Sequence, residues 1–191
     1  MNKITVVAVL AAIVLSACNT TSPGNVTSFN AKGNLESNKP SGCVSITNLS
    51  NQQNPVDIFS GINKCIEQER YSQAAELYIT AMSYGYFDTK RVSDKSAHQA
   101  LNVLRMNVLS GQSEEVMDNL QVALEKISSN NTFICQNLSK LGAPSYLPTY
   151  MIQHGMGAFM GQSTKDGLVE NFDSVTAWKE SLSTVADCIQ G

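Results

Sequence analysis

Apolar side chains recur at intervals of three and four along most of the chain after residue 54. This spacing gives each segment one apolar face and predicts amphipathic helices. Sustained alternation of apolar and polar residues, which is typical of half-buried strands, does not occur in the sequence. We therefore expect an all-α domain with about six helices, at roughly residues 55–67, 71–84, 96–109, 113–127, 133–141 and 174–189.

The segment 96–109 has the broadest apolar face of these six. Its main stripe is widened by Val103, Met106 and Leu109. A face of this width predicts a central helix that is buried on more than one side. The residues before it, 85–95, are expected to form a connection.

Residues 144–161 do not follow the helical pattern. They contain two prolines, three glycines and three methionines. Glycine inside a helix costs about 1 kcal/mol relative to alanine, so such a segment needs close backbone packing or a bound molecule. One hypothesis is a pocket in which His154 acts as a base or ligand, with Tyr150 one turn away. The alternatives are tight packing with a structural His154, or an adaptable binding surface formed by the flexible methionines.

The N-terminus has the pattern of a secretory signal. Lys3 is the only charged residue before Lys32, and an almost wholly apolar run extends from Ile4 to Val14. This run is shorter than the roughly 20 residues that a membrane-spanning helix requires. The four residues after it, Leu15-Ser16-Ala17-Cys18, resemble the lipobox of bacterial lipoproteins.

The lipobox resemblance implies that a signal peptide, residues 1–17, is removed and that Cys18 carries lipid on its sulfur and on its new amino group. Two or three acyl chains, such as palmitate, give a stable membrane anchor. The family's sorting rule, applied to Asn19 in a Gram-negative cell, points to the outer membrane and a periplasm-facing domain.

The residues after Cys18 are rich in Ser, Thr, Asn, Gly and Pro. Such a composition buries too little apolar surface to offset the entropy of ordering the backbone. We expect residues 18–42 to contain the lipidated cysteine and a disordered tether, and residues 43–191 to form the globular domain.

Four cysteines remain besides Cys18, an even number that predicts two disulfides in an oxidising compartment. Three pairings are possible, and the sequence does not choose among them. The pairing Cys43–Cys65 with Cys135–Cys188 is preferred, because it would join the start of the domain to its first helix and the last helix to an earlier one.

The charge balance bears on partners. The chain has 13 basic and 16 acidic residues, a formal net charge of −3, and no basic patch. This argues against nucleic acid as a partner. No CxxC or CxxH pair exists, and His98 and His154 are the only histidines, so no metal site or other cofactor is expected.

A second resemblance covers about residues 55–85. The pattern Tyr71-x-x-Ala74-x-x-x-Tyr78-x-x-Ala81 followed by Gly85 is similar to the second helix of a tetratricopeptide repeat, a helical hairpin. No second copy follows at the repeat interval, and solenoids need about three. The resemblance implies a single helical hairpin within a small domain.

Two functional hypotheses follow. The first is a non-catalytic, membrane-anchored envelope lipoprotein whose helical domain binds a protein partner, as an accessory or assembly factor or as an immunity-type protein. The second is a small periplasmic hydrolase centred on His154 and Tyr150. The sequence has no GxSxG motif, and no carboxylate lies within eleven residues of His154.

Overall fold

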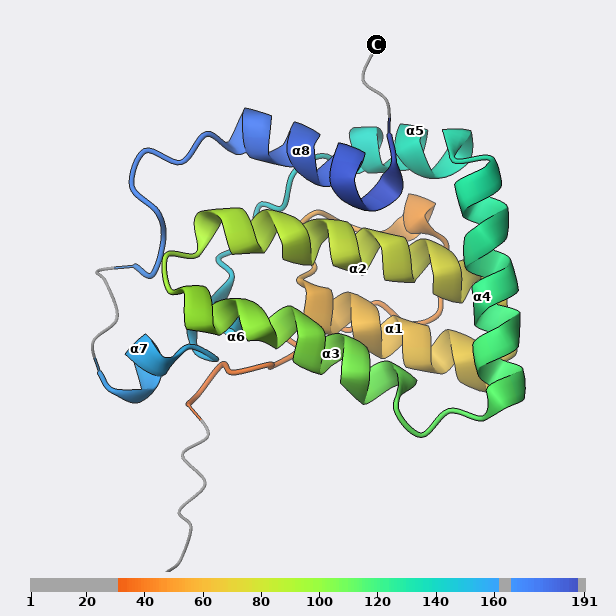
Figure 1. Ribbon diagram of the computed structural model, residues 1–191, viewed down its shortest axis with the longest axis horizontal. Coiled ribbons are helices and arrows are strands. Elements are labelled where there is room, and N and C mark those ends of the chain that lie inside the picture. The colour runs from red at the N-terminus through yellow and green to blue at the C-terminus, as the bar shows by residue number, and fades with distance from the viewer. Residues whose placement is uncertain (1–30, 162–165, 189–191) are drawn as a thin grey trace, which may run out of the picture.

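The computed structural model describes residues 31–161 and 166–188, which fold as an all-α domain (Figure 1). Within these residues, six helices have at least 10 residues, as predicted, and two have 4. The helices are α1 (Pro55–Glu67), α2 (Tyr71–Arg91), α3 (Gln99–Leu109), α4 (Glu114–Ser129), α5 (Thr132–Leu141), α6 (Thr149–Ile152), α7 (Met156–Phe159) and α8 (Ser174–Ala186), with 3-10 turns η1 (Ile46–Asn48) and η2 (Lys95–His98). The described part has no β-strand beyond one isolated bridge, between Val92 and Leu168.

The first two helices form a hairpin. At the start of α1 the Asn54 side chain accepts a hydrogen bond from the backbone N–H of Asp57, and the Asp57 carboxylate accepts one from the N–H of Asn54. This capping box, together with Pro55 at the first helical position, fixes where the helix begins. The apolar face of α1 is buried against the rest of the core through Ile58, Phe59, Ile62 and Ile66.

The central helix is α2, which packs against α1, α4 and α8 (Figure 1). The expectation that residues 96–109 form the central helix is wrong. Its helix, α3, buries one stripe only, and Met106 on its outer side is 61% exposed. The broad apolar face in the sequence therefore does not mean burial on several sides.

The connection expected at residues 85–95 is also wrong for its first half, because α2 continues to Arg91. Gly85 lies inside this helix, where a Cβ atom would be 2.3 Å from Cδ1 of Leu101. The absence of a side chain lets α2 and α3 approach closely at this point. The glycine marks a helix contact instead of a helix end.

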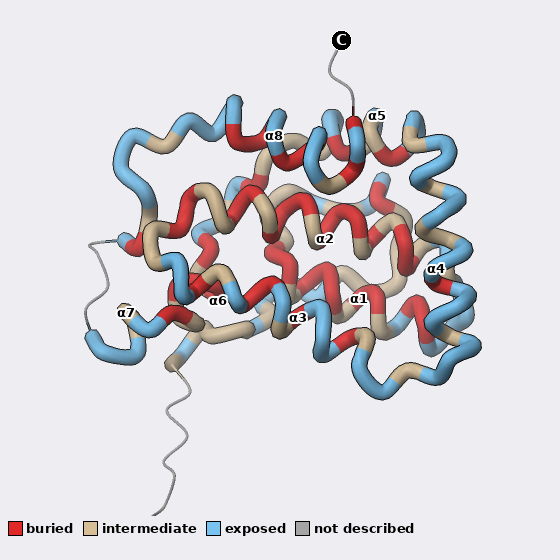
Figure 2. Tube along the Cα trace, viewed as in Figure 1, coloured by how far each residue is buried: buried red, intermediate tan, exposed pale blue. Residues whose placement is uncertain are grey.

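One end of the domain is covered by α4, which links α3 to α5 and runs across the ends of the other helices (Figure 1). Leu120 is its only fully buried residue. Figure 2 shows the contrast between α2, which is buried along most of its length, and α4, which is exposed along most of its length. The opposite end of the domain is formed by α6 and α7 (Figure 1).

Two disulfides tie the chain together. Cys43 is bonded to Cys65, and Cys135 is bonded to Cys188. The preferred pairing is therefore confirmed. The first bond attaches the segment before η1 to α1, and the second attaches α5 to the residues that follow α8.

Residues 31–42 differ from the expected disordered tether, because they pack on the domain. The Asp57 carboxylate accepts hydrogen bonds from the Ser37 hydroxyl and from the backbone N–H groups of Asn38 and Lys39, at 2.7–2.8 Å. The Leu35 N–H donates to the Tyr150 carbonyl. A buried carboxylate that needs donors thus orders a polar segment whose composition alone predicts disorder. Cys18, the predicted signal peptide 1–17 and the part of the predicted tether up to residue 30 lie outside the described residues.

Candidate functional site

The unusual stretch 144–161 forms a loop and two single-turn helices, α6 and α7, instead of one longer helix. Gly155 lies between the two helices, where a Cβ atom would be 2.4 Å from Oδ2 of Asp94. The glycine is therefore required by close packing against the residues that precede η2. Of the alternatives drawn from the sequence, this packing explains Gly155 without a bound molecule.

Tyr150 belongs to a buried polar cluster. Its hydroxyl donates to Oδ2 of Asp88 at 2.8 Å, and the hydroxyl of Tyr146 donates to the same oxygen at 2.8 Å. The other carboxylate oxygen of Asp88 accepts a 2.7 Å hydrogen bond from Nε of Arg91. The Arg91 guanidinium lies between the rings of Phe87 and Tyr146, about 5 Å from each ring centre. This cluster joins the end of α2 to α6.

The neighbours of Asp88 all act as donors. Burial raises the pKa of this carboxyl, while the Arg91 guanidinium and the two tyrosine hydroxyls act in the opposite direction. Arginine offers no acceptor for a carboxyl proton, so the ionised form of Asp88 makes the better set of hydrogen bonds. Burial raises the pKa of Tyr146 and Tyr150 well above the usual value, and the charge of Asp88 raises it further. Both tyrosines thus remain protonated donors.

His154 belongs to a different network. Its Nδ1 lies 2.9 Å from Oδ1 of Asn34, in the segment before α1. Partial burial lowers the pKa of His154 below its usual value, which favours the neutral ring at pH 7. The structure places Tyr150 and His154 in one segment, but it directs the Tyr150 hydroxyl to Asp88 and the His154 ring to Asn34. The two side chains do not form the pair that the hydrolase hypothesis requires.

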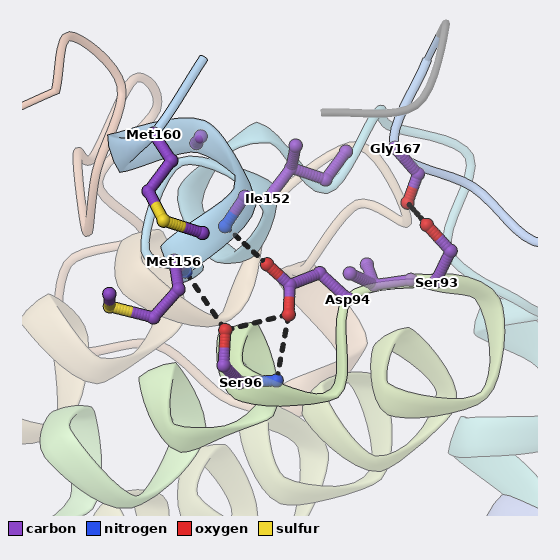
Figure 3. Close-up of a pocket in the computed structure, with 10 residues that line it drawn as sticks. Ser93, Asp94, Ser96, Ile152, Met156, Met160 and Gly167 are labelled. Carbon is purple, nitrogen blue, oxygen red and sulfur yellow. Dashed lines mark hydrogen bonds between the residues drawn. The ribbon is translucent and has the colours of Figure 1, made fainter. Parts of the chain in front are cut away.

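A surface pocket of about 420 Å³ lies beside α7 (Figure 3). Methionine and isoleucine side chains form much of its wall, and Figure 3 shows Met156 and Met160 at one side with Asp94 and Ser96 below. The lining residues come from the connection after α2, from η2, from α6, α7 and the residue after α7, and from the segment after residue 166: Val92, Ser93, Asp94, Ser96, Ile152, Met156, Gly157, Ala158, Met160 and Gly167.

The polar groups of this pocket are already used within the fold. The Asp94 carboxylate accepts from the hydroxyl and N–H of Ser96 and from the N–H of Gly157, at 2.6–2.9 Å. The Ser96 hydroxyl oxygen in turn accepts from the N–H of Met156. Donation by Ser96 and Gly157 lowers the pKa of Asp94 below its usual value. Asp94 is therefore an anchor for α7, and the groups left for a ligand are mainly apolar.

The end of the domain at α4 carries a second type of surface. Glu114, Asp118 and Glu125 lie on its outward face, with a helical spacing that places them near one another. Val122 is on the same side of the helix and is 65% exposed. The helix has four acidic residues and one lysine, so it carries a formal charge of about −3.

Two hollows with partly apolar walls flank α4. The first, of about 240 Å³, lies where α4 meets α2 and α3, and its wall includes Met117 and Leu124. The second, of about 330 Å³, lies where α4 meets α2 and α5, and its wall includes Ile127 and Phe133. Phe133, in the wall of this second hollow, is 50% exposed. The outer half of α4 thus combines acidic groups with accessible apolar surface.

Sequence reasoning missed several of these groups. Asp88 and Asp94 fell in an expected connection, and nothing in the local pattern indicated that they would meet residues about 60 positions later. Of the exposed acids of α4, the sequence pattern singled out only the two in the first turn of the helix, Glu114 and Glu115.

Among the described residues, no group of three or more His, Cys, Asp or Glu side chains is arranged to hold a metal ion. No helix within the described ranges is long and apolar enough to cross a membrane.

Comparisons with known proteins give no further assignment. No family model matches this chain, and no curated protein or solved structure matches it.

Proposed function

We propose that this protein is a lipoprotein of the cell envelope, anchored in the outer membrane through Cys18, whose helical domain binds a protein partner in the periplasm without catalysis. In this proposal α4 is the binding surface. The anchor rests on the lipobox resemblance of residues 15–18. The tetratricopeptide-like pattern of residues 55–85 fits a domain of this kind.

The observation that carries the proposal is the amphipathic but largely uncovered α4. Leu120 is its one fully buried residue, and four other apolar side chains are only partly buried against the core: Val116, Ala123, Leu124 and Ile127. Met117, Ala123, Leu124 and Ile127 also line the two flanking hollows. Exposed apolar surface bordered by polar groups marks protein interaction sites. A partner that covered both flanks would bury this surface and enclose α4.

The charges on α4 define the partner. Three carboxylates on the outward face, Glu114, Asp118 and Glu125, favour a basic surface with apolar side chains at its centre. Charge complementarity of this type sets orientation and speeds association. The partner is therefore expected to present lysine or arginine residues around an apolar core.

The geometry around His154 supports a non-catalytic domain. General base catalysis needs the base within hydrogen-bond reach of a group that it can activate. The His154 ring contacts the side-chain amide oxygen of Asn34, and the Tyr150 hydroxyl donates to Asp88. In this proposal both residues stabilise the fold.

Site-specific photocrosslinking in the native envelope tests the proposal. A benzoyl-phenylalanine placed at Val122 should capture a protein, and one placed at Val175 on α8 should not, although the two side chains are 65% and 63% exposed. Capture at both positions or at neither would refute α4 as the binding surface. The captured protein, once purified, should bind the Glu114→Lys, Asp118→Lys, Glu125→Lys triple variant on the order of tenfold more weakly.

A matched variant controls for general charge. Glu170→Lys changes an exposed acid in the segment before α8, far from α4 in the sequence. It should leave the affinity unchanged. A loss of affinity equal to that expected per charge on α4 would show that net charge, and not the α4 surface, decides binding.

A further inference from the structure

The α7 patch is an exposed apolar surface at the end of the domain opposite α4 (Figure 1). It consists of Met156, Phe159 and Met160, which are 54%, 61% and 54% exposed. The sequence around it contains no Asp, Glu, Lys or Arg between Lys140 and Lys165. Three large apolar side chains on adjacent turns, without a charge among them, form a surface suited to an apolar environment.

The N-terminal end of the described chain lies beside this patch. A Cβ atom on Gly33 would be 2.8 Å from Cγ2 of Thr149, so residues 31–33 contact α6. Asn34 contacts His154, two residues before α7. The chain that leads back to Cys18 therefore departs from the α6–α7 end of the domain.

The distance to the anchor is short. Residues 19–30 separate Cys18 from Ala31, and a chain of this length spans at most about 45 Å when fully extended. The ordering of residues 31–42 thus shortens the link between lipid and domain. Because this link starts from the α6–α7 end, that end can approach the bilayer more closely than the α4 end can.

We propose that the α7 patch rests on the lipid bilayer that holds the acyl chains of Cys18. This inference depends on the proposed lipid anchor. Methionine and aromatic side chains enter the boundary between headgroups and acyl chains, where their apolar atoms leave water. The anchor keeps the patch at a high local concentration beside the membrane. A weak affinity of the patch for lipid is therefore sufficient for it to contact the bilayer.

Two features favour lipid over a protein at this surface. The polar groups beneath the patch, Asp94 and Ser96, are hydrogen-bonded to each other and to the backbone of α7. These hydrogen bonds already use the groups that could otherwise recognise a protein partner specifically. Lys32 and Lys95 are exposed on the neighbouring segments, where they can meet anionic headgroups. Asp166 is also exposed near the pocket, so the contact rests mainly on apolar burial.

Fluorescence quenching in vesicles tests the contact. The full-length lipidated protein carrying Met156→Trp would be reconstituted into vesicles of phosphatidylethanolamine and phosphatidylglycerol, with or without bromine on the acyl chains. The native Trp178, which is 9% exposed on α8, is present in every sample as a reference. Val122→Trp, on α4, is the matched control.

The inference predicts that brominated lipid removes about half of the emission added by the tryptophan at position 156 and leaves that at position 122 unchanged. Protein that floats with the vesicles without quenching at position 156 would overturn the inference and leave the anchor intact. Equal quenching at both positions would also overturn it. Protein that fails to float would refute the anchor and with it this inference. A photocrosslink from position 156 to another protein would assign the patch to that partner instead.

Discussion

The buried carboxylate of Asp88 makes the stability of the domain sensitive to one hydroxyl. Replacing Tyr150 with phenylalanine removes one of the two hydrogen bonds to Oδ2 and keeps the ring in place. Tyr150 is 1% exposed, so water cannot replace the lost donor. A hydrogen bond to a charged group contributes about 1.5–3 kcal/mol, and we expect Tyr150→Phe to lower the free energy of unfolding by that amount.

Urea denaturation followed by circular dichroism measures this loss. With a slope of about 1–3 kcal/mol per molar urea, the midpoint should fall by roughly 1 M. Tyr86→Phe is the matched control, because its hydroxyl donates to the exposed Glu180 carboxylate. That change should leave the midpoint unchanged within error, since water can satisfy the freed group. Equal midpoints for Tyr150→Phe and the native protein would refute the role of the hydroxyl.

Three further predictions concern packing, charge and covalent ties. Gly85→Ala should lower the free energy of unfolding by about 1–2 kcal/mol, because the new methyl group clashes with Leu101. The double variant with Leu101→Ala should lose less stability than the sum of the two single losses. Losses that simply add in urea denaturation would refute the contact. Because the pKa of Asp94 is lowered in the fold, its contribution is present above its usual value of 3.8 and is lost as the pH falls through the lowered pKa. The stability difference between the native protein and Asp94→Asn should therefore shrink in acid, and a difference that grows would contradict this sign. Replacing both Cys135 and Cys188 with serine, which opens a separation of 53 residues, should cost up to about 4 kcal/mol, and an unchanged melting temperature would contradict this.

The helical spacing of apolar residues correctly predicted the helices whose starts and buried faces are set by residues near one another in the sequence. The first helix, α4 and α8 begin at side chains that cap them, Asn54, Ser113 and Asp173, and their apolar stripes face the core. These features depend on residues within a few positions of one another, so they are visible in the sequence. The disulfide pairing was also among the few arrangements that the cysteine count allowed.

The errors came from contacts between distant residues. A glycine after a helical stretch is typical of a helix end, but Gly85 lies inside α2, where it packs against Leu101. The segment 31–42 has the composition of a tether, but the Asp57 carboxylate orders it. Both outcomes depend on what lies opposite the residue in three dimensions, which local patterns do not contain.

The candidate site could be predicted only in part from the sequence, for the same reason. Tyr150 and His154 were singled out because they share a segment, whereas their hydrogen-bond partners, Asp88 and Asn34, lie 62 and 120 positions away. The surface of α4 depends on how little of it the other helices cover. That property follows from the packing of the whole domain.

The most direct test of the account is the affinity of the protein captured at Val122 for three forms of the purified protein. These are the native form, the triple lysine variant of Glu114, Asp118 and Glu125, and His154→Ala. The account predicts weaker binding of the triple variant, on the order of tenfold, with unchanged binding of His154→Ala. Unchanged binding of the triple variant together with a loss for His154→Ala would contradict the account and move the functional site to the α6–α7 end.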